Sequence, residues 1–379
     1  MIFLAVNRNK RSLALDLKSP EGLQFCKNLA RQADVMVESF GPGAAQRLGI
    51  GYEDLLAVNP RLVYCSISGY GTRGSMNKGK GYDLILQAFS GMLSITGEPD
   101  GPPVRRSFSP VDQGTGLHAV IGIMGALLQR GRTGAGMKIE TSLFDSAVSF
   151  LGYFLQSFWQ RGTEPVRPES GHESLCPYQA FETADKPLIL GIANDSLWKA
   201  FCNVADAPRL AADPRFATGA ERVRNRVETV AAVATIMATK TREAWMRLLE
   251  SNDIPCSPVH TLGELTQHEH TLASGMILHY RNALGQELRG VAAPLRVDGM
   301  RSALRARPPS LGQDTAAVLG ELGYGAARVR EMVEKRVVFA AAAVSTFLWY
   351  YERHKAEAPT HARTDLRPPH QRECPVERC

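Results

Sequence analysis

The sequence lacks the features that mark several classes of protein. Its seven cysteines are scattered, with no Cys-x-x-Cys pair and no spacing typical of zinc ligands, so we expect free thiols, a reducing compartment and no metal site. No signal peptide is visible, and the apolar run at 337–351 is shorter than the roughly 20 residues that span a bilayer. We therefore expect a cytoplasmic protein with no membrane partner.

The net charge is small for the length of the chain. At +6 and well dispersed, it does not indicate nucleic acid as a partner, but it suits an anionic ligand such as a nucleotide phosphate. The chain has 379 residues, of which 44% are hydrophobic and 22% charged. These values are typical of a globular protein with one large or two medium domains.

Strand and helix patterns alternate in the first part of the chain. A Ser19-Pro20-Glu21 helix-start signal lies between the first two of three apolar stretches. The three stretches, which are typical of strands, are residues 13–17, 33–38 and 62–68. The alternation predicts an α/β fold with a doubly wound parallel sheet. Because ligands of such sheets bind beyond the carboxyl ends of strands, Glu38-Ser39-Phe40 and Ser68-Gly69-Tyr70 are candidate ligand contacts.

The pattern changes after residue 160. Residues 161–175 are rich in Gly, Pro, Ser and charge, which predicts a linker. Residues 176–292 mix helix and strand patterns, with an antiparallel hairpin expected at 278–280 and 287–291, and predict a separate α+β domain. Residues 293–309 are rich in Arg and punctuated by Pro, which predicts a second linker.

Asp112 opens a long helix pattern that runs to about residue 130. An aspartate at a helix start is usually an N-cap, whose carboxylate accepts the first free N–H groups. A carboxylate there also feels the positive end of the helix dipole and stays ionised, and Gly114 and Gly116 would let a ligand approach the backbone closely. Asp112 is therefore a structural cap, a covalent nucleophile, or both.

Seven short motifs occur in an order and spacing that resemble the class III coenzyme A transferases, the CaiB/BaiF-type family that includes formyl-CoA and carnitine CoA-transferases. Each motif alone is weak, whereas seven in register are specific. They extend over residues 2–338 and are Asn7 to Ser12, Glu38 to Gly43, Ser66 to Gly71, Gly81 to Asp83, Gly91 to Gly97, Asp112 to Gly116 and Arg130 to Gly136.

The resemblance implies a Rossmann-like, doubly wound large domain built from both ends of the chain and a smaller α+β domain built from its middle. Two linkers join them, and two subunits interlock as a homodimer. The expected divisions are 1–160 for the first part of the large domain, 161–175 for a linker, 176–292 for the small domain, 293–309 for a linker and 310–338 for the return to the large domain. Residues 339–379 match nothing in the family, and we expect an atypical tail with a helix over the apolar run and a disordered end.

By its place in the motifs, Asp112 matches the catalytic aspartate of the family. The residues that match the coenzyme A contacts of the family are Asn9, Lys10, Phe40, Gly41, Arg47, Lys80 and Tyr82. The resemblance places Asn9 and Lys10 against the nucleotide, Arg47 at a phosphate, and Lys80 and Tyr82 along the pantetheine channel. From the residues alone, a solvated charge run is the favoured interpretation of Lys10, and Phe40 is equally a core residue.

The activity that the resemblance implies is transfer of coenzyme A between two carboxylic acids, with acyl-CoA and a free acid as partners and no metal. Asp112 would attack the thioester to give a mixed anhydride and free CoA thiolate, which would then form an aspartyl-CoA thioester. An acceptor carboxylate would reverse these steps. The transition states carry an oxyanion, to which we expect the glycine-rich backbone near Asp112 to donate N–H groups.

Two other interpretations remain open. The α-methylacyl-CoA racemases resemble the same family but carry a histidine where this chain has Tyr82, and tyrosine, with an ordinary pKa of about 10, is a poor base at neutral pH. His118 does not replace that histidine, because its place further along the helix turns it away from Asp112. The second alternative is an inactive, truncated member of the family, because the chain starts without the βαβ segment with which members usually begin.

Overall fold

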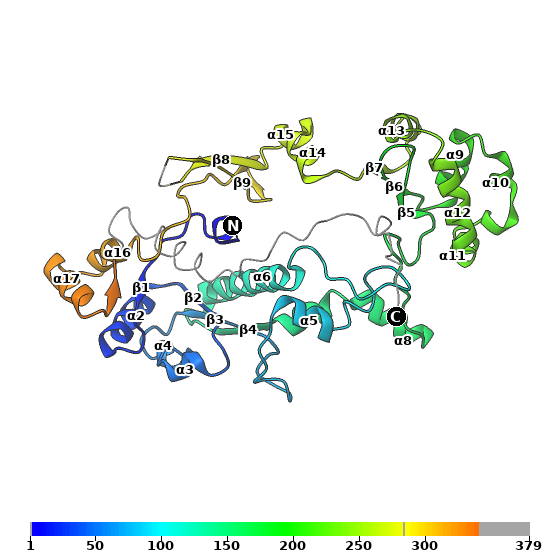
Figure 1. Cartoon of the computed structure of the whole chain (residues 1–379). Coiled ribbons are helices and arrows are strands. Elements are labelled where there is room, and N and C mark those ends of the chain that lie inside the picture. The colour runs from blue at the N-terminus through cyan, green and yellow to red at the C-terminus, as the bar shows by residue number, and fades with distance from the viewer. Residues whose placement is uncertain (1, 283–284, 341–379) are drawn as a thin grey trace, which may run out of the picture. The chain divides into compact units, whose positions relative to one another are not determined.

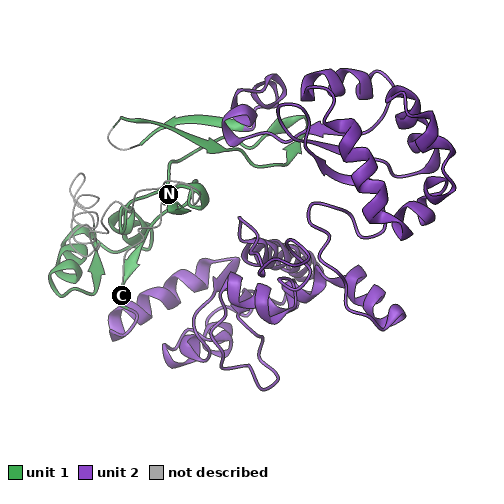
Figure 2. Ribbon diagram, turned by 45° about the vertical axis from the view of Figure 1, so that its right-hand side comes forward, with its two compact units in different colours: residues 1–16, 277–379 green, residues 17–276 purple. Residues whose placement is uncertain are grey.

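The computed structural model describes residues 2–282 and 285–340, whose elements form two compact units (Figures 1 and 2). Unit 1 contains residues 1–16 and 277–379, and unit 2 contains residues 17–276. Both units contain helices and strands, so the fold is mixed α/β. This division places residues 277–292 in unit 1, whereas we predicted them to belong to the small domain; the predicted domain boundaries stay a prediction.

A three-stranded parallel sheet lies at the centre of the first part of unit 2. Its strands β2 (Val35–Glu38), β3 (Val63–Ser68) and β4 (Lys138–Ser142) lie in this order. All three run in the same direction, with Val35 opposite Val63 and Cys65 opposite Ile139. Parallel strands need long crossovers, and here helices between the strands supply them, as the alternating pattern predicted.

Helices cover both faces of this sheet. On one face Tyr64 packs with α2 (Pro20–Gln32), α3 (Ala44–Arg47) and α4 (Tyr52–Leu56). On the other face lies α6 (Pro110–Thr133), where a Cβ added to Gly122 would come 3.0 Å from Ile139. α2 begins where the sequence predicts, because Ser19 accepts the N–H of Gly22 at 3.0 Å.

The predicted strand at 13–17 does not join the parallel sheet. β1 (Ala14–Leu15) belongs to unit 1 and pairs antiparallel with β12 (Val338–Phe339). The expectation that the stretch at 13–17 is a strand of the parallel sheet is therefore wrong, because β1 pairs with a strand near the end of the described chain. The expectation of a helix over the whole apolar run is also wrong at its start, where Val338 and Phe339 are strand; the expected tail at 341–379 lies outside the described residues.

The second part of unit 2 has its own antiparallel sheet and core. Strands β5 (Tyr178–Phe181), β6 (Leu188–Gly191) and β7 (Cys256–Pro258) pair in this order. Helices α9 (Asp195–Val204), α12 (Arg226–Met237) and α13 (Arg242–Glu250) bury Trp198, Val233 and Trp245 in a core with Leu188 and Leu190 of the sheet. The other helices of unit 2 are α5 (Asp83–Phe89), α7 (Leu143–Ser149), α8 (Gly152–Arg161), α10 (Pro208–Ala212), the 3-10 helix η1 (Pro214–Phe216), α11 (Gly219–Arg224) and α15 (Glu269–Ala273).

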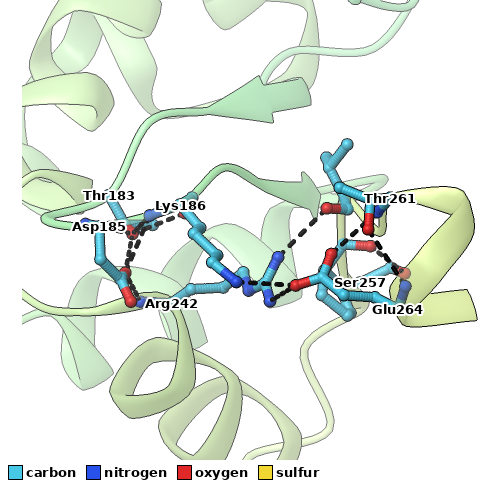
Figure 3. A network of polar contacts seen from close by, with 9 residues as sticks. Thr183, Asp185, Lys186, Arg242, Ser257, Thr261 and Glu264 are labelled. Atoms are coloured by element: carbon cyan, nitrogen blue, oxygen red, sulfur yellow. Dashed lines mark hydrogen bonds and ion pairs between the residues drawn. The ribbon is translucent and has the colours of Figure 1, made fainter. Parts of the chain in front are cut away.

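A polar network joins the start of α14 (Leu262–Gln267) to this core (Figure 3). Glu264 accepts from Lys186 at 2.7 Å and from Arg242 at 3.3 Å, and it closes a capping box with Thr261. The hydrogen bond from Lys186 is the main cause that lowers the pKa of Glu264 to about 2. The ion pairs of Glu264 with Lys186 and Arg242 therefore require an ionised Glu264.

Unit 1 contains the predicted hairpin. β8 (Ile277–Arg281) and β9 (Glu287–Val291) pair antiparallel, with His279 opposite Arg289. The predicted linker at 293–309 contains a further pair of short strands, so it is not entirely irregular. The remaining described elements of unit 1 are α1 (Ile2–Val6), β10 (Arg296–Val297), β11 (Met300–Arg301), α16 (Thr315–Glu321) and α17 (Ala326–Glu334).

The glycines of α6 have two different environments. A Cβ on Gly114 would lie 2.2 Å from Phe150, so close packing against this ring requires glycine there. A Cβ on Gly116 would have no atom within 4 Å. The same helix exposes Leu117, Ile121 and Leu128, and by length and composition alone it would suffice to cross a membrane, a property that it shares with core helices of soluble proteins.

We expect Gly114→Ala to lower the free energy of unfolding by about 1–3 kcal/mol, because the added methyl group overpacks the contact with Phe150. Gly116→Ala is the matched control, since it adds the same methyl group to the same helix in open space. We expect it to leave stability unchanged or raise it by up to about 1 kcal/mol through helix propensity. Denaturant unfolding of both variants measures the difference, and equal effects would contradict the packing assigned to Gly114.

We also expect the stability contributed by Glu264 to depend on pH. Its pKa is about 2 in the folded chain and has an ordinary value of 4.5, so its contribution is present above pH 4.5 and is lost as the pH falls to about 2. Glu264→Gln should therefore lower the Tm near neutral pH and have little effect near pH 2. Glu243→Gln, which removes an exposed carboxylate of α13 paired with Arg247, is the control; a Glu264→Gln effect that did not change with pH would contradict the role of the ionised network.

Candidate active site

α6 begins two residues before Asp112. Its first residue is Pro110 and its N-cap position is Ser109, so Asp112 is the third residue of the helix. The interpretation of Asp112 as the N-cap is therefore wrong. Proline favours the first position of a helix because its φ is already helical and it has no N–H to satisfy, and it moves the start of α6 upstream of the aspartate.

A second carboxylate, that of Asp83 at the start of α5, caps α6 from outside. Its Oδ1 accepts the backbone N–H of Val111 at 2.9 Å and of Asp112 at 3.1 Å. Its Oδ2 accepts from Gln87 Nε2, and Gln87 Oε1 accepts the N–H of Arg106 at 3.3 Å. Asp83 and Gln87 are both buried. The backbone of Asp112 is thus fixed by a buried polar network.

The side chain of Asp112 reaches solvent, but enough protein surrounds its carboxylate to change its acidity. This partial desolvation, followed by the charge of Asp83, raises the pKa of Asp112 above its ordinary value. These two effects oppose the effect of the helix dipole, which we expected to keep this carboxylate ionised. The carboxylate is a stronger base than an ordinary aspartate.

The first turn of α6 has no free N–H group for an oxyanion. Val111 and Asp112 donate to Asp83, Gln113 donates to Ser109 O at 3.0 Å, and Pro110 has no N–H. The expectation that the backbone beside Asp112 stabilises an oxyanion does not hold for this turn, because Asp83 already uses its donors.

A contact between two glycine backbones brings the segment before α5 to the end of β3. A Cβ on Gly69 would lie 2.6 Å from Gly81 N, and a Cβ on Gly81 would lie 2.4 Å from Gly69 Cα. Only glycine at both positions permits this approach. Lys80, Tyr82 and Asp83 are neighbours of Gly81 in the sequence. The contact therefore places them near the carboxyl end of the sheet, where ligands of parallel sheets bind.

A buried carboxylate also shapes the end of β2. Glu38 is 9% exposed; its Oε2 accepts the N–H of Phe40 at 2.9 Å and its Oε1 accepts from the hydroxyl of Ser66 on β3. Phe40 is 43% exposed, so it is not a core residue. Gly41 has no atom within 4 Å of an added Cβ, so its backbone is open to a ligand.

The other predicted site residues are on the surface. Arg47 on α3 donates to Pro42 O at 3.3 Å, and Lys80 and Tyr82 are exposed, Tyr82 by 68%. Asn9 and Lys10 belong to unit 1, where Asn9 binds backbone groups of 303–306 and Lys10 donates to Asn7 at 3.0 Å. In the described residues no group of three or more His, Cys, Asp or Glu could hold a metal ion.

The side chain of His118 contacts residues other than Asp112. Its Nδ1 lies 3.0 Å from Ser146 Oγ on α7, and its ring lies against Phe150. This agrees with the expectation that His118 does not pair with Asp112. The residues that sequence reasoning missed are Asp83 and Gln87; the only signal was the place of Asp83 at the end of a short motif, with no role attached to it.

We expect Asp83→Asn to lower the pKa of Asp112 towards its ordinary value. The amide keeps an oxygen that accepts the two N–H groups but removes the negative charge that disfavours ionisation of Asp112. NMR titration of the Asp112 carboxyl carbon measures this shift. The control is Asp100→Asn, which removes an exposed carboxylate that is not a cause of the raised pKa of Asp112. An unchanged Asp112 pKa in Asp83→Asn would show that the two carboxylates do not interact.

The chain is similar to proteins of one family. The family model for CoA-transferase family III matches residues 1–315. An acyl-CoA transferase of Fusarium pseudograminearum is 37% identical over 338 residues, which cover 89% of this chain and 74% of that protein. A succinyl-CoA:glutarate CoA-transferase of Mus musculus is 36% identical over 320 residues, which cover 84% and 73%. The crystal structure of a CAIB/BAIF family protein from Brucella suis matches with a TM-score of 0.74 at 33% identity and covers 84% of this chain and 83% of that one. The chain therefore belongs to CoA-transferase family III.

Proposed function

We propose that this chain transfers coenzyme A between two carboxylic acids through covalent intermediates on Asp112. The observation that carries the proposal is the environment of this carboxylate. It is open to solvent, its backbone is fixed by the buried Asp83, and burial and the Asp83 charge raise its pKa. A fixed and accessible carboxylate with a raised pKa suits nucleophilic attack on a thioester.

The reaction proceeds by acyl exchange. Asp112 attacks the carbonyl carbon of an acyl-CoA; a C–O bond forms, the C–S bond breaks, and CoA leaves as a thiolate. The thiolate attacks the Asp112 carbonyl of the mixed anhydride, the donor acid leaves as a carboxylate, and Asp112 holds CoA as a thioester. The acceptor carboxylate then reverses the two steps. Charge balances throughout, because each step exchanges one anion for another.

The coenzyme A contacts remain those that the resemblance supplies. In unit 2 these are the open backbone at Gly41, the exposed ring of Phe40, and the side chains of Arg47, Lys80 and Tyr82. The resemblance also supplies Asn9 and Lys10, which belong to unit 1. The geometry at the ends of β2 and β3 supports the contacts of unit 2, since Glu38 and the Gly69–Gly81 approach hold both loops at the carboxyl edge of the sheet.

For the acids, we propose succinyl-CoA as donor and a dicarboxylic acid such as glutarate as acceptor. The support is the similarity to the succinyl-CoA:glutarate enzyme of Mus musculus. A racemase requires a second proton-transfer group opposite Asp112. Tyr82 is an exposed phenol and His118 is bonded to Ser146, so the arrangement favours the transferase.

We further propose the Rossmann-like two-domain arrangement, an interlocked homodimer and a cytoplasmic location. The apolar stripe that α6 exposes at Leu117, Ile121 and Leu128 supports burial against a second copy of the chain. Light scattering of the purified protein tests the dimer, and a monomer at all concentrations would contradict it.

We expect Asp112→Asn to lose CoA-transferase activity at least about a thousandfold, because an amide neither forms the anhydride nor carries the thioester. Succinyl-CoA and glutarate are the assay substrates, with product CoA esters separated by chromatography. Asp145→Asn, which replaces the first-turn carboxylate of α7, is the control for folding and should keep its activity.

Retained transfer by folded Asp112→Asn would contradict the assignment of the nucleophile. Exchange of the α-hydrogen of a 2-methylacyl-CoA with solvent deuterium, without any transfer, would favour the racemase instead.

A further inference from the structure

A buried polar network connects the loop before α6 to the start of that helix. α5 packs beside α6 (Figure 1), and the network runs through two residues of α5, Asp83 and Gln87, which are 8% and 0% exposed. Gln87 donates to Asp83 and accepts the N–H of Arg106 at 3.3 Å, whereas Asp83 accepts the N–H of Asp112 at 3.1 Å. The backbones of Arg106 and Asp112 are therefore held by opposite ends of one network.

The guanidinium of Arg106 is exposed and free. In the part of the chain that the structure describes, its side chain makes no hydrogen bond and no ion pair; only its backbone is bonded, to Gln87 and to the Nε of Arg105 at 3.2 Å. An exposed arginine is by itself ordinary. This one differs because its backbone is fixed by the same buried groups that fix Asp112, so its cation belongs to the surroundings of the candidate site.

The charges around Asp112 disfavour a further anion. Asp83 and Asp112 are two carboxylates at one end of α6, and the charge of Asp83 contributes to the raised pKa of Asp112. No cation of the described residues lowers that pKa, so no guanidinium lies against the Asp112 carboxylate. An acid with two carboxylates would bring another negative charge to this place, where like charges repel. A cation near Asp112 but not paired with it would offset this repulsion and leave the nucleophile free.

The length of a short diacid suits such a cation. Four C–C bonds of about 1.5 Å each separate the two carboxyl carbons of glutarate, so these carbons lie at most about 5–6 Å apart. When one carboxylate reacts at Asp112, the other lies that far away, and the arginine side chain has a comparable length. A guanidinium can bind this second carboxylate through two parallel N–H···O bonds.

We propose that Arg106 binds the distal carboxylate of a dicarboxylic acid substrate, so that the site selects diacids over monocarboxylic acids. The inference rests on the proposed function and names the residue that sets its substrate class. Both the acyl group of succinyl-CoA and the acceptor glutarate carry such a carboxylate.

The test compares glutarate with pentanoate, which has the same number of carbons but lacks the distal carboxylate. With succinyl-CoA at saturation, kcat/KM for the acceptor acid reports its reaction with the aspartyl-CoA thioester. We expect Arg106→Gln to lower kcat/KM for glutarate at least about tenfold, since the charge-assisted bonds to the distal carboxylate are lost. The value for pentanoate should stay unchanged. Arg106→Lys, which keeps the charge but not the paired donors, should retain part of the preference.

The matched control is Arg132→Gln, which removes an exposed arginine from the last turn of α6, at the opposite end of the helix from Asp112. It should leave kcat/KM for both acids unchanged, and a loss for glutarate equal to that in Arg106→Gln would overturn the inference in favour of general charge attraction. An equal loss for glutarate and pentanoate in Arg106→Gln would overturn it in favour of a structural role for Arg106.

Calorimetric binding of glutarate and pentanoate to the full chain, without acyl-CoA, separates this inference from the proposed function. A chain that transfers no CoA, yet binds glutarate at least about tenfold more weakly in Arg106→Gln, would contradict the proposed function and support the carboxylate site. A chain that transfers CoA with the same preference in Arg106→Gln would leave the proposed function standing and overturn the role of Arg106. An inactive chain whose glutarate binding does not depend on Arg106 would overturn both.

Discussion

The candidate site depends on the hydrogen bonds that the start of a helix donates to one buried carboxylate. Asp83 accepts the N–H groups of Val111 and Asp112, so it replaces the cap that α6 lacks and fixes the backbone of Asp112, the proposed nucleophile, at the same time. Its charge also acts on Asp112, because two carboxylates on one helix terminus disfavour ionisation of the more accessible one. Asp83 thus fixes the backbone position of Asp112 and adds to the desolvation that raises its pKa.

A second buried carboxylate has a similar role at the end of a neighbouring strand. Glu38, buried at the end of β2, accepts the N–H of Phe40 and bonds Ser66 on β3. In each case a carboxylate satisfies backbone donors that a loop would otherwise leave unpaired in a partly buried place. Buried carboxylates therefore hold the loops at the carboxyl edge of the sheet, where the family resemblance places coenzyme A, and such positioning suits a site that must orient its ligand.

The structural features that the sequence predicted correctly depend on local signals. The Ser19 cap, the β8–β9 hairpin and the alternation of strands with helices follow from neighbouring residues, and the resemblance singled out Asp112. What it did not predict depends on distant partners. The pairing of β1 with β12, the cap of α6 by Asp83 and the fixing of Arg305 by Asn9 join residues far apart in the chain. No local pattern reports such partners, so the role of Asn9 as a backbone clamp emerged only from the structure.

The central claim is that Asp112 becomes covalently activated, and peptide mass spectrometry tests it most directly. The purified chain is incubated with succinyl-CoA and hydroxylamine, which converts an activated aspartyl group to a hydroxamate, and is then digested. The account predicts a modification on the peptide that contains Asp112, dependent on the thioester and absent from Asp112→Asn. A protein that binds CoA and transfers it, yet carries no modification at Asp112, would contradict the account.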